Sequence, residues 1–139
     1  MVNPQTGNAR AFAVQKATSE TVHEILNTNV SRQTTLVTDE SPLYKKAGYK
    51  SHKRVFHTIK EYVNKDCFTT NNVENFFGIF KKGMIGTYHF CGEQHLQRYL
   101  NEFAFRYSNR SGLGIEDGER AALAIRNASG KRLTYRQAN

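Results

Sequence analysis

One helical pattern constrains this chain more than any other feature of the sequence. Residues 71–82 read NNVENFFGIFKK, and their apolar side chains fall at Val73, Phe76, Phe77 and Phe80. The spacing i, i+3, i+4, i+7 places all four on one face of an amphipathic helix. The aromatic rings on that face predict a helix seated against the sheet of the domain. Glu74 then lies at the border of the apolar face, next to the core but within reach of a cleft.

A second helix is predicted from about His95 to Tyr107. We expect Gly83 and Gly86 to break the first helix before this one begins. The second helix has its own apolar stripe, formed by Leu96, Tyr99, Leu100, Phe103 and Tyr107. After the SGLG loop, the stretch EDGERAALAIRNASGKRLTY predicts a short helix and a basic tail.

The first third of the chain has shorter patterns. Residues 9–14, ARAFAV, alternate enough to predict a strand, and a helix follows with Thr18 or Ser19 as its N-cap. Residues 34–38, TTLVT, are a β-branched run typical of a buried strand. That strand ends directly at Asp39.

Another helix–strand pair follows. Residues 41–48, SPLYKKAG, predict a short helix with Pro42 in its first turn and Gly48 as its stop. Residues 53–59, KRVFHTI, predict a further strand. Alternation of short strands and helices favours an α/β domain. At 139 residues the chain is long enough for one core, so we expect residues 1–139 to form a single domain in which 112–139 are a basic C-terminal extension.

Charge points to the class of partner. Twenty Lys and Arg against twelve Asp and Glu give a net charge of +8. This balance favours a polyanion, most often nucleic acid and less often a membrane surface, over an unspecialised basic surface. No apolar run approaches the ~20 residues that span a bilayer, and the N-terminus lacks the apolar core of a signal peptide. Cys67 and Cys91 are isolated, which fits a reducing compartment, so a cytoplasmic location is expected.

Two acidic residues carry the most chemistry. Asp39 stands at the C-terminal end of a predicted strand, where open α/β sheets bind ligands, and Glu74 stands on a predicted helix. Carboxylates that converge there can hold Mg²⁺, which prefers oxygen ligands and keeps waters for substrate phosphates. The residues alone leave the alternative open, since an Asp after a strand is more often a helix cap and a lone Glu on a helix is usually solvated.

Several segments in a fixed order resemble a known family. They are TDESPLYKKAG, histidines at 52 and 57, NNVENFFGIFKKGMIGTYH, HLQRYLNEFAFRYSNR and, near the end, GKRLTY. The chain resembles the catalytic domain of bacterial insertion-sequence transposases of the ISXO type, from about Arg10 to Tyr135. This resemblance implies a DDE transposase with a ribonuclease-H-like fold, in which helices flank a mixed sheet. It also implies Mg²⁺ or Mn²⁺ as cofactor, DNA as partner, a homo-oligomeric synaptic complex and a place in the bacterial nucleoid.

The resemblance also implies roles for individual residues. Asp39 matches the second acidic metal ligand of the family, Glu74 the last acid, and Asn71 an asparagine that supports the metal or its waters. His57 matches a histidine after the fifth strand. Lys81, Lys82, Tyr88 and His89 match a block that is expected near the DNA backbone. Independently of the resemblance, the charges of Arg98, Arg106 and Arg110 make them candidate phosphate contacts, with an ordinary solvated charge as the alternative for each.

The family's first aspartate has no counterpart in the sequence. Asp39 is the first aspartate, and only Glu20 and Glu24 are acidic before it. We therefore expect an N-terminally truncated domain that lacks the first strand and most of the second. Without the acid that bridges both metal ions, we expect this polypeptide alone to have no strand-transfer activity and to associate or aggregate.

Three alternatives stay open at the level of sequence. The chain could be a non-catalytic, transposase-derived protein that binds nucleic acid without cutting it. It could be an unrelated basic α/β nuclease with a different acidic partner for Asp39. His89, Cys91 and His95 could form a soft metal site, although their spacing fits no standard zinc pattern.

Overall fold

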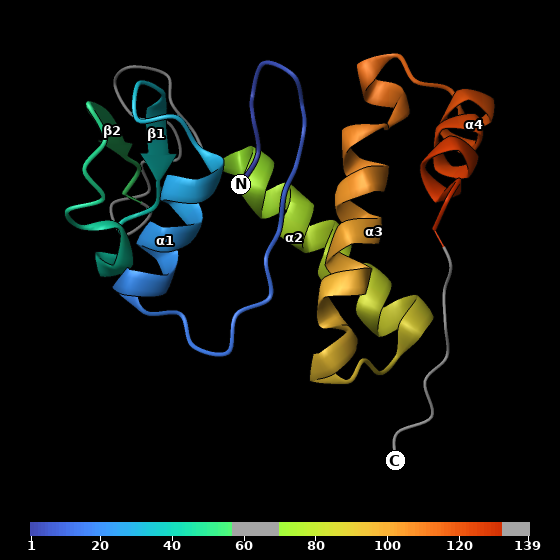
Figure 1. The fold of residues 1–139 in the computed structure, drawn as a ribbon, viewed down its shortest axis with the longest axis horizontal. Coiled ribbons are helices and arrows are strands. Elements are labelled where there is room, and N and C mark those ends of the chain that lie inside the picture. The colour runs from blue at the N-terminus through green and yellow to red at the C-terminus, as the bar shows by residue number, and fades with distance from the viewer. Residues whose placement is uncertain (57–69, 132–139) are drawn as a thin grey trace.

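The computed structural model describes residues 1–56 and 70–131. These residues form a mixed α/β arrangement, which confirms the predicted α/β class at this level. The sheet and the first helix lie at one end of the molecule, and the last two helices lie toward the other (Figure 1). In chain order the elements are α1 (Ser19–Asn29), β1 (Thr35–Thr38), β2 (Ser51–Arg54), α2 (Asn71–Gly83), α3 (Leu96–Ser108) and α4 (Asp117–Ala128).

The sheet in the described residues consists of two parallel strands. Thr35 of β1 pairs with Ser51 of β2, and the register runs without a bulge to the pair Thr38 and Arg54. The strand predicted over 53–59 therefore starts two residues earlier and ends at Arg54, and residues 57–59 lie outside the described residues. Parallel strands need a crossover connection. Here the crossover is short and contains a single helical turn, Pro42–Tyr44, where the sequence predicted a helix over 41–48.

The strand predicted over residues 9–14 is wrong. Apart from one isolated bridge at Ala9, this segment has no strand pairing in the described structure. The side chain of Gln97 on α3 takes the place of a neighbouring strand. It accepts a hydrogen bond from the backbone of Ala13 at 2.8 Å and donates one to the carbonyl of Ala11 at 3.0 Å. Because a helix side chain satisfies the extended backbone, no second strand is required.

The helices agree more closely with the prediction. The N-cap of α1 is Thr18, whose hydroxyl accepts a hydrogen bond from the backbone of Thr21 at 3.3 Å. The predicted helix over 71–82 is confirmed, with Phe76 2% exposed at the centre of its apolar face. α3 begins at Leu96, one residue later than predicted, after a single helical turn over Glu93–His95. The helix predicted after the SGLG loop is α4, which has no buried residue.

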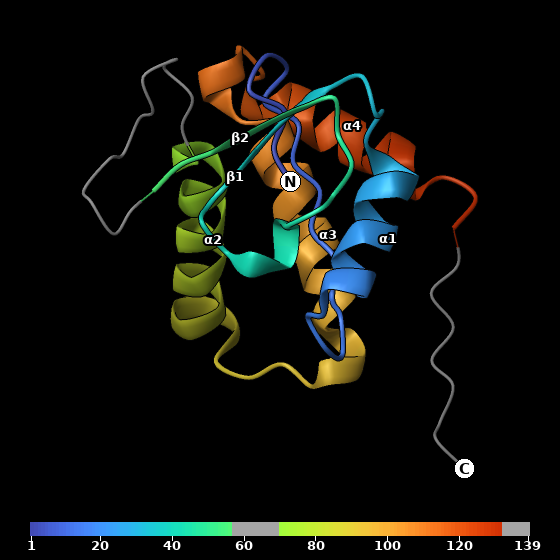
Figure 2. The same cartoon turned by 90° about the vertical axis from the view of Figure 1, so that its left-hand side faces the viewer.

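Gly83 does not break the helix as predicted. Its backbone is helical, with φ −66° and ψ −42°, and the chain continues into a π-helical turn over Met84–Tyr88 that includes Gly86. Gly83 matters because of close approach. A Cβ atom at this position would overlap the ring of Phe103 on α3. The missing side chain lets α2 and α3 pack together. Figure 2 views the molecule from its sheet end, with α1 and α2 on opposite sides.

Buried side chains form two clusters. The sheet-side cluster is Leu26, Ala47 and Tyr49, with Met1, Val22, Val30, Leu36 and Tyr44 packed against it. The helix-side cluster is Ala9, Ala11, Phe76, Leu100 and Tyr107, with Val2, Phe80, Leu96, Phe103 and Ala104 packed against it. The N-terminal segment contributes to both, which joins the sheet end of the molecule to the helical end. None of the described helices has the length and apolar character needed to cross a bilayer.

Candidate active site

A cavity of about 410 Å³ lies between the end of β1 and the start of α2, beside the sheet-side cluster. Its wall includes Thr38 and Asp39 from the end of β1, and Thr70, Val73 and Glu74 from the start of α2. The structure thus brings Asp39 and Glu74, which are far apart in the sequence, to the wall of one cavity. Ligands of open α/β sheets bind at the carboxyl ends of strands, which is where Asp39 stands.

Asp39 is exposed and is positioned by a local turn. One of its carboxylate oxygens accepts a hydrogen bond from the backbone N–H of Ser41 at 3.1 Å, the pattern of an Asx turn. Tyr44, which also lines the cavity, has a raised pKa, chiefly because its phenol is buried and also because the negative charge of Asp39 is close. Asp39 is not the helix cap that sequence reasoning left open, because Ser41 is the N-cap of the turn Pro42–Tyr44. The Asp39 carboxylate instead forms the turn before that cap, and it lines the cavity.

A histidine to which sequence reasoning assigned no role supports the strand end. The hydroxyl of Thr38 donates to the carbonyl of Asp39 at 2.8 Å and lies 3.0 Å from Nε2 of His52. A hydroxyl has one hydrogen, so Nε2 of His52 is the donor in the second bond. Burial and, after it, the charge of Arg54 lower the pKa of His52, which favours the neutral ring. The sequence signal was faint, since the two residues meet only through the register of the sheet.

Glu74 lies in the first turn of α2. The hydroxyl of Thr70, a buried residue, donates to its Oε1 at 2.7 Å. The position of this turn is set from α3, because the hydroxyl of Tyr107 donates to the carbonyl of Asn72 at 3.1 Å. The ring of Tyr107 also packs edge-to-face against Phe76, with centroids 5.5 Å apart. The aromatic face of α2 therefore determines where Glu74 stands, but the predicted partner is wrong: Phe76 and Phe80 pack against α3 and not against the sheet.

Asn71 and His57 are placed less directly. Asn71 is the first residue of α2 and is exposed, and it does not belong to the cavity wall in the described structure. His57 lies outside the described residues. Their supporting roles stay predictions.

The cavity offers oxygen ligands. The carboxylates of Asp39 and Glu74 are the ligand type that Mg²⁺ and Mn²⁺ prefer, so the donor set fits such an ion in kind. Across residues 1–56 and 70–131, however, no group of three or more His, Cys, Asp or Glu side chains could hold a metal ion. This excludes the alternative soft metal site at His89, Cys91 and His95, all of which are described.

The predicted DNA-contacting lysines stand at the far end of α2 from the cavity. Lys81 and Lys82 are exposed in the last turn of the helix, whereas Glu74 is in the first. Seven residues of helix separate Glu74 from Lys81, about 10 Å along the axis. Arg98 is exposed near the start of α3. Lys81 and Lys82 therefore lie away from the acidic cavity along α2.

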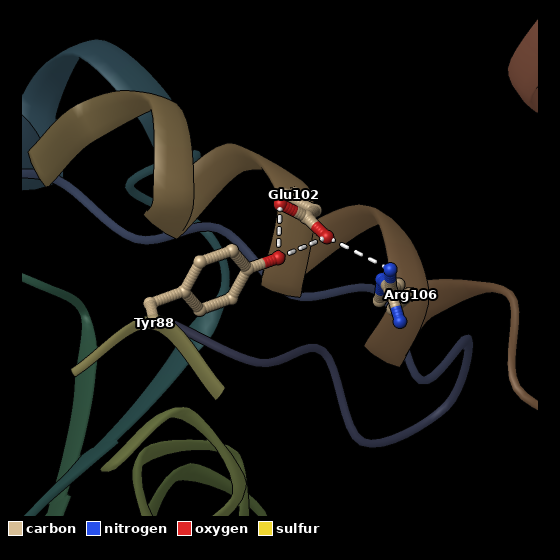
Figure 3. A network of polar contacts seen from close by, with 3 residues as sticks. All are labelled: Tyr88, Glu102 and Arg106. Atoms are coloured by element: carbon tan, nitrogen blue, oxygen red, sulfur yellow. Dashed lines mark hydrogen bonds and ion pairs between the residues drawn. The ribbon is translucent and has the colours of Figure 1, made fainter. Parts of the chain in front are cut away.

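Tyr88 belongs to a polar network that the sequence did not reveal. Its hydroxyl donates to Glu102, at 2.8 Å and 2.9 Å from the two carboxylate oxygens (Figure 3). Glu102 also forms an i, i+4 ion pair with Arg106, at 2.9 Å. The hydrogen bond to Glu102 is the main reason that the pKa of Tyr88 is raised, with desolvation second. Tyr88 and Arg106 are thus held by the same carboxylate.

The two remaining candidates for DNA contact are Arg110 and His89. The guanidinium of Arg110 lies 4.0 Å from the ring centroid of Tyr107 and donates to the carbonyls of Tyr107 and Gly7, at 2.5 Å and 3.4 Å. This side chain ties the N-terminal segment to the end of α3. His89 is exposed and has a positive φ of 58°. Contact with DNA stays a prediction for both residues.

Comparison with known proteins gives one match. The family model described as the ISXO2-like transposase domain matches residues 1–108 of the 139. The matched range contains both cavity acids and ends with the last residue of α3, so α4 lies beyond it. Searches of curated proteins and of solved structures found no significant match.

Proposed function

Because the chain belongs to the ISXO2-like transposase family, we propose that its function in DNA transposition is that of a DDE-type catalytic domain with a ribonuclease-H-like fold. The reaction class is metal-dependent hydrolysis of phosphodiesters and strand transfer at the ends of an insertion sequence. One observation carries the proposal: Asp39, at the end of a parallel strand, and Glu74, on a helix from the other cluster, line the same cavity.

In this proposal the cavity acids hold Mg²⁺ or Mn²⁺, with Asn71 and His57 in support. A bound divalent ion supplies an activated water and stabilises the charge that develops on the leaving oxygen. Thr70 orients the Glu74 carboxylate through its hydroxyl, and the turn at Ser41 orients that of Asp39. A rigid arrangement of both carboxylates lowers the cost of bringing two negative charges together around a cation.

The basic residues serve the DNA in this proposal. The net charge of +8 favours a polyanionic partner, and the exposed cations Lys81, Lys82 and Arg98 are suited to phosphates. Tyr88, His89, Arg106 and Arg110 are the further candidates for this surface. We expect a homo-oligomer to assemble on the two transposon ends, as the resemblance implies, and the DNA to be that of the bacterial nucleoid.

A second candidate function is DNA binding without cutting. The described residues place two carboxylates at the cavity, and they hold no group of three metal-binding side chains. Two-metal chemistry needs a carboxylate that bridges both ions in addition to the flanking ones. We therefore expect the 139-residue chain to bind DNA and to show no strand transfer on its own.

Divalent-ion binding tests the cavity directly. Titration of the purified chain with Mn²⁺, followed by electron paramagnetic resonance of the free ion, should show one binding class. Asp39→Asn and Glu74→Gln should each weaken it at least about tenfold, since each removes a charged ligand. Glu119→Gln, an exposed acid of α4, is the matched control and should leave binding unchanged.

The outcomes separate the two candidates. Mn²⁺ binding that depends on both cavity acids supports the DDE assignment of Asp39 and Glu74. Equal binding in all variants, or no binding at millimolar Mn²⁺, overturns that assignment. Gel-shift measurement of DNA binding by the same proteins then decides whether the chain retains the DNA-binding function alone.

A further inference from the structure

The connection between α2 and α3 exposes unusual amounts of apolar surface. Phe90 is 82% exposed and Ile85 is 75% exposed, and they are the two most exposed large apolar side chains among the described residues. Single exposed apolar residues are common on protein surfaces. Two of them within six residues of one connection, one being a phenylalanine, mark a candidate contact surface. We call residues 85–90 the α2–α3 tip.

The backbone of the tip has a rare conformation next to Phe90. His89 has φ 58° and ψ −39°, and the N–H of Phe90 donates to the carbonyl of Tyr88 at 2.6 Å. This is a γ-turn with positive φ at its centre, a conformation that is strained for a residue with a side chain. Such strain persists only where the surroundings enforce it, and it is concentrated at functional sites.

The surroundings that enforce it lie on α3. Tyr88, the residue before the turn, is held by its hydroxyl at Glu102 (Figure 3). Its ring packs edge-on against Tyr99, with centroids 4.7 Å apart, and against Phe103 at 6.2 Å. The chain is therefore fixed at Tyr88 and turns sharply at His89. Phe90 follows directly and stays in solvent.

Charge around the tip indicates the kind of partner. Lys81 and Lys82 are exposed in the last turn of α2, just before the tip, and one exposed acid, Glu93, follows it. A second copy of a chain with net charge +8 would bring like charges together at this surface. A polyanion would instead bring opposite charges together at this surface. DNA offers phosphates for the lysines and base faces for an aromatic ring.

We propose that the α2–α3 tip is a wedge for duplex DNA, in which Phe90 inserts between two bases while Lys81 and Lys82 hold adjacent phosphates. The inference rests on the proposed function, because it takes DNA as the partner. Apolar side chains that insert between base steps unstack them and kink the duplex. A wedge carried by a rigid turn suits this task, since little side-chain or backbone ordering is needed on binding.

Fluorescence of 2-aminopurine tests the wedge. The probe is a short duplex with 2-aminopurine beside TA steps, which unstack easily. Adding the 139-residue chain should raise the fluorescence, because the base loses its stacking partner. Phe90→Ala should abolish most of that rise and weaken binding at least about fivefold, the usual loss for one stacked base. Phe90→Trp should restore both.

Ile125→Ala is the matched control, since Ile125 is 74% exposed on α4, far from the tip in sequence. It should change neither the fluorescence nor the affinity. DNA binding by the parent chain without a rise, or with an equal rise in Phe90→Ala, overturns the wedge and leaves the proposed function standing. A parent chain that binds no DNA overturns both. Loss of a dimer in Phe90→Ala, seen by sedimentation with DNA binding unchanged, also overturns the wedge and assigns the tip to a second copy.

Discussion

The two sides of the cavity are held in place by different kinds of interaction. On the helix side, aromatic rings predominate: Phe76 packs against Tyr107, and Phe80 against Phe103 with centroids 5.2 Å apart. On the sheet side the cluster is small, and side chains bind the backbone instead. The hydroxyl of Tyr49 lies 2.9 Å from the carbonyl oxygen of Leu26 and 3.1 Å from that of Val30, so its one hydrogen is shared between the two acceptors.

This difference teaches how a short sheet can carry a site residue. Two strands bury little apolar surface, and a two-stranded unit is marginal without packing against other elements. The sheet side therefore depends on hydrogen bonds to the backbone, including those from Arg32 to the carbonyls of Ala47 and Gly48, at 3.0 Å and 2.8 Å. The helix side depends on ring burial. The position of Glu74 should then be sensitive to substitutions that remove buried ring volume on the helix side. The position of Asp39 should be sensitive to substitutions that remove hydrogen bonds on the sheet side.

The largest expected effect is on the helix side. Phe76→Ala should lower the free energy of unfolding by about 3–5 kcal/mol, because it empties a buried site at the centre of the aromatic packing. Phe77→Ala, at a neighbouring position that is 41% exposed, should cost less than about 1 kcal/mol. Urea denaturation followed by far-ultraviolet circular dichroism measures both. Equal losses would mean that ring burial does not distinguish this side.

The next effect concerns the close approach of α2 and α3. Gly83→Ala should destabilise by about 1–3 kcal/mol, because the added methyl group overlaps the Phe103 ring. Gly78→Ala, in the same helix with no neighbouring atom within 4 Å, should stabilise by about 0.5–1 kcal/mol through helix propensity. Opposite signs for the two variants in thermal and urea unfolding would support the contact. A stabilising Gly83→Ala would refute it.

On the sheet side we expect a smaller loss from a single hydroxyl. Tyr49→Phe should lower the free energy of unfolding by about 1 kcal/mol, since two backbone carbonyls lose their donor while the ring stays buried. Tyr99→Phe serves as control, because within the described residues its hydroxyl has no hydrogen bond. If Tyr99→Phe lowers the free energy of unfolding as much as Tyr49→Phe does, hydrogen bonds to the backbone are not what stabilises the sheet side.

The smallest effect is a dependence on pH. The pKa of His52 is lowered in the folded protein from its ordinary 6.5, so the unfolded chain takes up the proton first as the pH falls. The contribution of His52 to stability is therefore full above pH 6.5 and declines below it, by a small amount because the ring is only partly buried. Unfolding of the parent and of His52→Gln, compared at several pH values, should show this decline in the parent alone. The same slope in both proteins would contradict it.

Short sequence patterns correctly predicted the features that depend on neighbouring residues, namely helices and a helix cap. The amphipathic stripes predicted α2 and α3 within a residue or two at each end, and Thr18 was correctly predicted as the N-cap of α1. The wrong predictions are those that depend on contacts between distant parts of the chain. Residues 9–14 have the alternation of a strand, but their hydrogen bonds go to Gln97, some 85 positions further along the chain. Gly83 resembles a helix stop, and only the position of Phe103 reveals its role.

The site divides in the same way. Asp39 and Glu74 could be selected from their places at a strand end and on a helix face, together with the family resemblance. The partners that orient them could not, because Thr38 meets His52 through sheet register and Tyr107 reaches Asn72 across two helices. The hydrogen bond between Tyr88 and Glu102 could not be predicted from the sequence for the same reason, because the two residues meet only after the chain folds back on itself.

The packing of Gly83 against Phe103 also has an evolutionary consequence. Drift at these two positions cannot be independent: a lineage that gains a side chain at position 83 must first accept something smaller than a benzene ring at position 103, or separate the two helices. An alignment of relatives should therefore contain glycine paired with an aromatic, or a larger residue paired with a small one, and few chains that combine bulk at both positions.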